Sequence, residues 1–234
     1  IWASGNSGFA LTGVGRNPQE YPTVSIENGI DGSRAIKLET KSTGQFGETV
    51  KMPIAAGNLF LGSFDVNNAV QKPLKATRFG LPFGKKPLQL KGYYKYTPGT
   101  QPFKAKDKNG NTVTIPGQED EGDIYAVLYE AAELDGKALD GNNVLTSENI
   151  VALARVEVEK KDEFTAFHVD FHYGSRIPID WPKFIQDQRD PSDDGTAPYL
   201  SFSEEKMKNY EYNLAVVFTS SKYGAYFAGS VGST

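Results

Sequence analysis

The sequence predicts an all-β protein made of two packed antiparallel sheets, with little helix. Apolar and polar residues alternate in many segments, whereas no long stretch follows the helical period of about 3.6 residues. Turns rich in glycine, proline, asparagine and aspartate separate these segments, in a chain with 24 glycines and 13 prolines. The 14 phenylalanines and 12 tyrosines can fill a large core between the sheets.

The clearest alternation lies in residues 88–97. Lys91, Tyr93 and Lys95 share one face of this expected strand, and Leu90 belongs to the other. Tyr93 is therefore expected to point away from the core.

The other elements follow in chain order. Asn109-Gly110 lies between two alternating runs and predicts a hairpin turn. Residues 124–130 are apolar on both faces, as in a central strand. Short helices are expected at residues 183–189 and at 203–210, where Ser203 is the N-cap. The expected strands are residues 34–40, 59–66, 88–97, the hairpin 103–115, and residues 124–130, 150–158, 165–173 and 211–219.

The length of 234 residues suits one large domain. No low-complexity linker and no repeat of fixed period is visible. The polar stretch 117–122 is interpreted as a loop, because strands are expected on both sides of it. We therefore expect a single domain over residues 1–234.

The composition excludes several classes of site. The chain has no cysteine, which rules out disulfides, cysteine-ligated metal sites and a cysteine nucleophile. The net charge of −4 argues against general nucleic-acid binding. No apolar run approaches the roughly 20 residues that a membrane-spanning helix requires.

Three segments carry a resemblance to a known family. They are residues 53–64 (PIAAGNLFLGSF), 77–96 (TRFGLPFGKKPLQLKGYYKY) and 217–234 (VFTSSKYGAYFAGSVGST), supported by residues 123–130 (DIYAVLYE) and 2–6 (WASGN). Together they resemble the "putative carbohydrate metabolism domain" of surface and secreted proteins of Bacteroidetes.

The resemblance implies a jelly-roll β-sandwich similar to carbohydrate-binding modules. It also implies an exported protein, at the cell surface or in the periplasm, often a lipoprotein anchored through an upstream cysteine and often carrying an upstream immunoglobulin-like domain. Such jelly rolls usually close with a last strand after the Gly-Ser-Thr that here ends at Thr234. The resemblance supplies no catalytic residues.

Aromatic side chains are the first candidates for a sugar site, because sugar C–H faces stack on aromatic rings. Tyr93 is the best of them, with Lys91 and Lys95 beside it to pair with hydroxyl groups; the alternative is an ordinary surface tyrosine in a cross-strand pair. Trp181 lies in a loop-like stretch, and the alternative is that it plugs the core. Tyr223, with Tyr226, follows the strand expected at 211–219, and the alternative is that both fold back onto the sandwich.

Both histidines fall in one expected strand, where His168, Asp170 and His172 would project from one face. Residues four apart in a strand are separated by about 13 Å, so the two histidines cannot share one metal ion there. One histidine with Asp170 could bind a metal with help from another strand; the alternative is a solvated face.

Calcium is the more natural ion for loops rich in carboxylates. Asp120, Glu121 and Asp123 form one acidic loop. Asp187, Asp190, Asp193 and Asp194 form another. Neither has the spacing of an EF-hand, so we expect no cofactor, with structural calcium at Asp190, Asp193 and Asp194 as the alternative.

A glycoside hydrolase needs two carboxylates about 5–10 Å apart. Asp170 and Glu157 are the weak candidates, because they are expected to point outward on adjacent strands. Neither a nucleophile elbow nor a zinc-protease motif nor a P-loop is present.

The leading hypothesis is a non-catalytic carbohydrate-binding module that stacks a polysaccharide or oligosaccharide on Tyr93, Trp181 or Tyr223. The alternatives are a glycoside hydrolase of unassigned mechanism and a structural or adhesion module at the cell surface.

Overall fold

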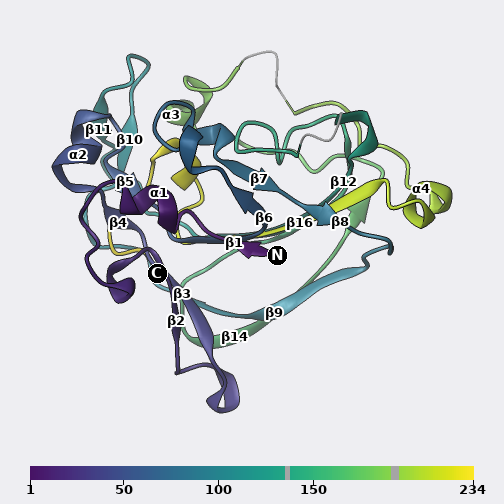
Figure 1. Cartoon of the computed structure of the whole chain (residues 1–234), viewed down its shortest axis with the longest axis horizontal. Helices are drawn as coiled ribbons and strands as arrows, with labels where there is room; N and C mark the ends of the chain where they lie inside the picture. The colour runs from purple at the N-terminus through teal and green to yellow at the C-terminus, as the bar shows by residue number, and fades with distance from the viewer. Residues whose placement is uncertain (135–137, 191–194) are drawn as a thin grey trace.

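The computed structural model describes residues 1–134, 138–190 and 195–234 (Figure 1). Its strands are β1 (Trp2–Ala3), β2 (Thr23–Ile26), β3 (Ala35–Leu38), β4 (Lys41–Ser42), β5 (Ile54–Ala55), β6 (Asn58–Phe64), β7 (Thr77–Phe79), β8 (Leu81–Pro82), β9 (Gln89–Tyr96), β10 (Lys104–Lys106), β11 (Thr112–Thr114), β12 (Asp123–Glu130), β13 (Ile150–Val156), β14 (Lys161–Asp170), β15 (His172–Tyr173) and β16 (Tyr212–Thr219). Its α-helices are α1 (Asn6–Ala10), α2 (Gly44–Thr49), α3 (Lys183–Gln186) and α4 (Glu204–Lys208), and its 3-10 helices are η1 (Pro18–Glu20), η2 (Ile30–Gly32), η3 (Val66–Asn68), η4 (Pro73–Lys75), η5 (Ala132–Leu134) and η6 (Gly224–Tyr226).

Eight strands form one antiparallel main sheet in the order β1-β6-β16-β12-β13-β15, with β7 beside β6 and β8 beside β16. Strand β12 lies at its centre, and all its residues are buried. Ala126 of β12 lies between Val216 of β16 and Ala154 of β13. The apolar run at residues 124–130 thus forms the central strand that the pattern predicts.

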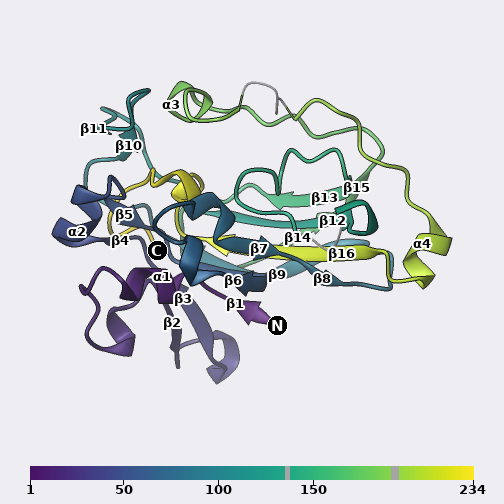
Figure 2. The same cartoon turned by 45° about the horizontal axis from the view of Figure 1, so that its top comes forward.

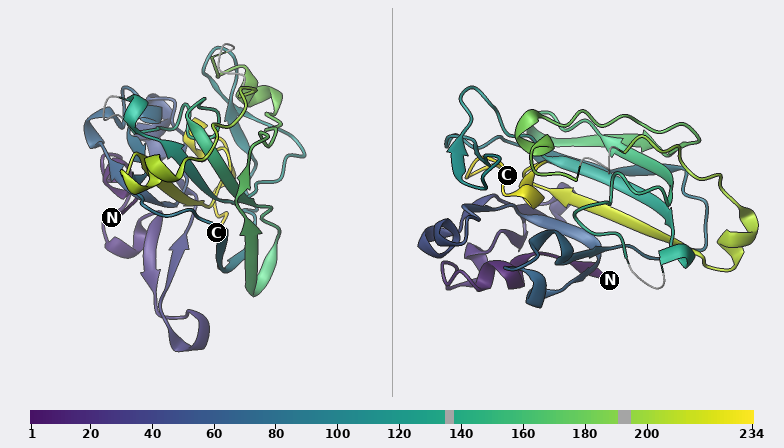
Figure 3. Two further views of the ribbon diagram at one scale, coloured as in Figure 1. Left: turned by 90° about the vertical axis from the view of Figure 1, so that its right-hand side faces the viewer. Right: turned by 90° about the horizontal axis from the view of Figure 1, so that it is seen from above.

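Two ribbons form the second layer, the pair β2–β3 and the pair β9–β14. They project side by side from the main sheet in the left view of Figure 3. Leu90 of β9 and Val169 of β14 pack on a cluster of the main sheet that contains Ala126 and Val216. The predicted all-β sandwich is confirmed, although its second layer consists of two separate ribbons.

The opposite face of the main sheet is covered by long connections. Tyr129 and Phe60 of the sheet pack with Leu139, Val144 and Tyr199, which come from the segments after β12 and β15. Figure 2 shows the described parts of the chain between β15 and α4 lying over this face. No helix in the described part of the chain is long and apolar enough to span a membrane.

The alternation predicts one strand over residues 165–173, but the structure divides this segment between two strands. Strand β14 ends at Asp170 and pairs with β9, whereas His172 begins β15, which pairs with β13 in the main sheet. The chain changes layers at the buried Phe171. His172 is therefore not on the strand of His168, and it contacts the hydroxyl of Ser175 at 3.0 Å.

Strand β13 also differs from its prediction. It ends at Val156, and every residue of 150–154 is buried, because both of its faces are covered. The prediction that only one face of this strand is buried is therefore wrong. The two expected helices are present as α3 and α4, and the Ser203 hydroxyl caps α4 by accepting the N–H of Lys206 at 3.3 Å.

A buried carboxylate holds the C-terminal segment. Asp120 is 2% exposed, and its Oδ2 accepts hydrogen bonds from the hydroxyls of Ser221 (2.6 Å) and Ser233 (2.8 Å) and from the N–H of Ser230 (2.7 Å). Burial raises the pKa of Asp120 to about 6, although these hydrogen bonds act in the opposite direction. The loop before β12 and the chain end are thus joined inside the fold.

Candidate functional site

The outer face of the β9–β14 ribbon collects the best sequence candidates. On β9 the residues alternate between exposed and covered, with Tyr93 exposed. The register of the pair places Tyr93 opposite Ala166, and Lys91 opposite His168. We call this surface the ribbon face; its members are Lys91, Tyr93, Lys95, Phe164, Ala166 and His168.

Tyr93 presents an uncovered ring. Its side chain is 60% exposed, and its cross-strand neighbour Ala166 is too small to cover it. In the described part of the chain, no aromatic ring pairs with Tyr93 and no cation lies over it. Tyr94, by contrast, points inward and lies 6.1 Å from the ring of Phe167. The prediction that Tyr93 points away from the core is confirmed.

Charged and polar groups surround this ring. Lys91 and Lys95 are exposed on either side of Tyr93 along β9. The ammonium of Lys95 lies 5.4 Å from the ring centre of Phe164, a half-buried aromatic side chain of β14. At the far end of the ribbon, Gln89 donates a hydrogen bond to Asp170 at 2.6 Å. The ribbon face therefore offers aromatic surface next to hydrogen-bond donors and acceptors.

A groove of about 740 Å³ adjoins the ribbon face. Its walls come from β3, with Ile36 and Lys37, and from β9, with Tyr93 and Lys95. Its floor is apolar and belongs to the main sheet; it includes Leu59, Ile124 and Phe218. Trp2, which is 50% exposed, lies on the same sheet face, with its ring 6.1 Å from that of Phe218.

Trp181 and Tyr223 are brought together elsewhere, on the opposite side of the main sheet. Their ring centres are 6.4 Å apart, and Tyr226 lies 6.3 Å from Trp181. The guanidinium of Arg189 lies 4.3 Å from the centre of the Trp181 ring. Phe184 packs edge-on against Tyr223. Both rings are half-buried in this cluster, so their faces are already occupied by the protein.

The indole nitrogen of Trp181 is buried and has no hydrogen-bond partner in the described residues. A cavity of about 210 Å³ touches Trp181, Arg189 and Tyr226. Trp181 therefore packs inside the protein, as the alternative of a core-plugging side chain predicted. Its indole N–H is a buried donor without a hydrogen-bond partner in the described residues.

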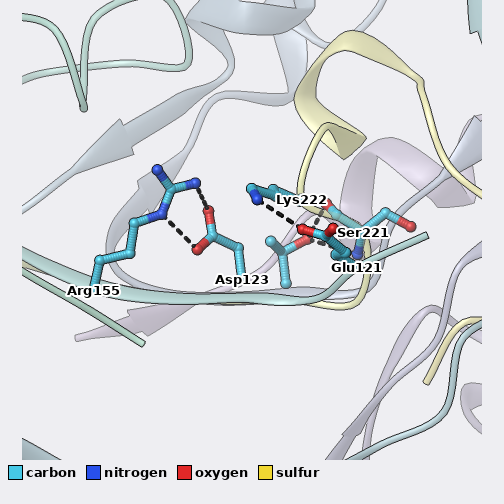
Figure 4. A network of polar contacts seen from close by, with 6 residues as sticks. Glu121, Asp123, Arg155, Ser221 and Lys222 are labelled. Carbon is cyan, nitrogen blue, oxygen red and sulfur yellow. Dashed lines mark hydrogen bonds and ion pairs between the residues drawn. The ribbon is translucent and has the colours of Figure 1, made fainter. Parts of the chain in front are cut away.

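Two ion pairs lie beside this cluster (Figure 4). Arg155 donates from Nε and Nη2 to the two carboxylate oxygens of Asp123 at 2.9 and 2.7 Å, and Lys222 pairs with Glu121 at 2.7 Å. Burial lowers the pKa of Arg155, but the charge and hydrogen bonds of Asp123 outweigh it and raise the pKa. Burial raises the pKa of Tyr223. Asp123 is thus held as a paired carboxylate.

The two weak catalytic candidates do not lie on adjacent strands. Asp170 ends β14, where it accepts the hydrogen bond of Gln89. Glu157 is exposed in the connection after β13, because that strand ends at Val156. The structure therefore does not place Asp170 and Glu157 on neighbouring strands, as the hypothesis of a catalytic pair expected.

Calcium ligands are not assembled in the described residues, where no group of three or more histidine or acidic side chains could hold a metal ion. Asp120, Glu121 and Asp123 point to different partners, a serine cluster, Lys222 and Arg155. Asp190 is described, but Asp193 and Asp194 lie outside the described residues. Asp187 pairs with Lys183 at 3.0 Å.

Comparison with known families covers the whole chain. The model of the family called "Putative carbohydrate metabolism domain" matches residues 1–234. The chain belongs to this family. A search of curated proteins finds no match.

Two solved structures resemble the chain over almost its whole length. A Bacteroides thetaiotaomicron protein described as a putative glycoside hydrolase has a TM-score of 0.80 and 43% identity; the alignment covers 99% of this chain and 59% of that one. A Bacteroides vulgatus protein with the same description has a TM-score of 0.78 and 37% identity, covering 99% and 81%. The chain thus spans less than two thirds of the first of these proteins.

Several residues at the ribbon face and the adjoining groove could not be identified from the sequence alone. Ala166 lies opposite Tyr93 only through the strand pairing, and Phe164 of the same strand lies against Lys95. Trp2 and Phe218 are far apart in the chain and meet on the floor side of the groove. The alternation around Ala166 could have marked its side as outward, but no local signal names its partner strand.

Proposed function

We propose that this chain is a non-catalytic carbohydrate-binding module whose ribbon face binds a polysaccharide or oligosaccharide. One observation carries the proposal: Tyr93 presents an uncovered ring between two exposed lysines. The membership in a carbohydrate-related family supports it.

The chemistry of the ribbon face suits a sugar ring. The apolar C–H face of a sugar stacks on Tyr93, since an aromatic ring carries negative charge on its face. Lys91, Lys95 and His168 surround the ring with groups that pair with hydroxyls. Phe164, whose ring centre lies 5.4 Å from the ammonium of Lys95, adds aromatic surface at that end of the ribbon face.

The proposal includes a cellular location. An exported bacterial protein, at the cell surface or in the periplasm and anchored as a lipoprotein, would meet such glycans. Support comes from the two Bacteroides structures and from a fold that needs no disulfide.

A glycan array of plant and host polysaccharides, followed by calorimetry on the hits, tests the binding function. We expect at least one glycan to bind the chain, and Tyr93→Ala to weaken it. Tyr210→Ala is the matched control, because Tyr210 is 65% exposed and lies outside the ribbon face. No binding across the array, or equal loss in both variants, would refute the proposal.

A glycoside hydrolase is the second candidate, favoured by the description of the two structural neighbours. Release of reducing ends from a bound glycan, lost in Asp170→Asn, would establish it. A structural or adhesion module is the third, and a tight protein partner without any glycan binding would favour it.

A further inference from the structure

Two unbalanced positive charges flank the exposed ring of Tyr93. Lys91 and Lys95 are exposed on β9, and in the described part of the chain neither forms an ion pair. Lys91 lies opposite His168, and the ammonium of Lys95 lies 5.4 Å from the ring centre of Phe164. Because residues two apart in a strand are separated by about 6.6 Å, each lysine is one such step from Tyr93.

Other cations near the groove and the ribbon are already paired with carboxylates. These ion pairs are Arg34–Glu27 (2.9 Å), Lys37–Glu39 (2.6 Å) and Lys161–Glu159 (2.8 Å). Beside the Trp181 cluster, Arg155 and Lys222 are likewise held by Asp123 and Glu121. A ligand that stacks on Tyr93 therefore meets cations whose charge it can balance itself.

Carboxylates lie toward the two ends of the ribbon face. At one end, Asp170 lies opposite Gln89 and accepts its hydrogen bond at 2.6 Å. At the other end, Asp162 and Glu163 are exposed where the register of the β9–β14 pair shifts. The cationic part of the ribbon face is therefore the span of β9 that has Tyr93 at its middle.

The hydrogen-bonding capacity of these lysines favours an anion over a neutral hydroxyl group. An ammonium group donates three hydrogen bonds and accepts none, whereas a hydroxyl group both donates and accepts. A carboxylate only accepts, and a sulfate ester resembles it in this respect. Hydrogen bonds between two charged groups are also about twice as strong as neutral ones. Lys91 and Lys95 thus satisfy an anionic substituent fully and a hydroxyl group only in part.

We propose that the ribbon face selects glycans that carry negative charge, as the carboxylate of a uronic acid or as a sulfate ester. The C–H face of a sugar stacks on Tyr93, and the anionic groups pair with Lys91 and Lys95. This inference rests on the proposed carbohydrate-binding function and adds the chemical class of the glycan. Because the chain has a net charge of −4, it repels a polyanion on average, and local positive charge decides where such a ligand docks.

Two matched pairs of polysaccharides test the selection for charge. Dextran sulfate differs from dextran by its sulfate esters, and polygalacturonate differs from its methyl-esterified form by its free carboxylates. Calorimetry at low salt should show that the charged member of at least one pair binds at least about tenfold more tightly than the neutral member. The pair that shows this difference assigns the anionic group as sulfate or carboxylate.

Charge variants locate the attraction on the ribbon face. Lys91→Gln and Lys95→Gln should each weaken binding of the charged glycan about threefold, and the double variant about tenfold, as expected for exposed ion pairs. Binding of a neutral glycan and the melting temperature should not change. Lys108→Gln is the matched control, because Lys108 is exposed in the turn between β10 and β11 and its replacement removes the same charge. Added salt should weaken binding by the parent more than by the double variant.

The outcomes separate this inference from the binding function on which it rests. A neutral glycan that binds as tightly as its charged counterpart, and whose binding Tyr93→Ala weakens, would overturn the selection for charge and leave the binding function standing. Equal weakening by Lys108→Gln would mean that the attraction is not located at the ribbon face, which also overturns the inference. If neither the pairs nor the glycan array gives any binding, both the inference and the binding function fail.

Discussion

Tyr93 on β9 lies directly opposite Ala166 on β14. A cross-strand neighbour without a large side chain leaves the tyrosine ring open to solvent, while the pairing holds it in place. The ribbon face owes its exposed ring to this pairing.

Replacing Tyr93 tests that relationship. Tyr93→Ala should weaken glycan binding about fivefold to tenfold, because stacking on one ring contributes about 1 kcal/mol. Its melting temperature should stay close to that of the parent, because the ring is exposed. Calorimetry and a thermal melt decide both points, and a large drop in melting temperature would mean that the ring supports the fold instead.

Trp181 should behave in the opposite way. Trp181→Ala removes a ring that packs against Arg189, Tyr223 and Tyr226, and we expect it to lower the free energy of unfolding by about 3 kcal/mol. Glycan affinity should be unchanged. Urea unfolding measures the first quantity, and a selective loss of glycan binding at full stability would move the sugar site to Trp181.

The buried pair of Asp123 and Arg155 predicts a large cost for removing one partner. Arg155→Leu leaves a carboxylate whose side chain is 4% exposed without its cation, and should cost about 3 kcal/mol of unfolding free energy. Adding Asp123→Asn should restore part of it. A double variant that is no more stable than Arg155→Leu alone would contradict this interpretation.

Asp120 predicts a dependence of stability on pH. Its pKa is raised from 3.8 to about 6 in the folded protein, so the folded state binds the proton more tightly than the unfolded chain. Its contribution is fully present below pH 3.8 and is lost as the pH rises through 6, an effect of up to about 3 kcal/mol.

Urea unfolding at pH 4, 5, 6 and 7 measures this change against Asp120→Asn, which should lack it. Asp107→Asn is the control, because hydrogen bonds from the backbone of Asn111 lower the pKa of the exposed Asp107 and give the opposite sign. The same loss of stability toward neutral pH in parent and Asp120→Asn would exclude Asp120 as its source.

The binding function predicts no hydrolysis. Incubation of the chain with a glycan that it binds should release no reducing ends, and Asp170→Asn and Glu157→Gln should leave that result unchanged. A steady release that one of these variants abolishes would replace the binding module with the hydrolase.

Local pattern was enough to predict most strands and the outward direction of Tyr93, Lys91 and Lys95. Side chains of a strand alternate by backbone geometry, whatever the strand pairs with. The short helices α1 and α2 were not foreseen, because each contains glycine and neither carries a capping side chain.

Only the tertiary structure decided which strands meet. It placed Ala166 opposite Tyr93, divided His168 and His172 between two layers, and set Arg189 over Trp181. These relationships join residues far apart in the chain, and they follow from the burial of shared apolar faces, which no local period encodes.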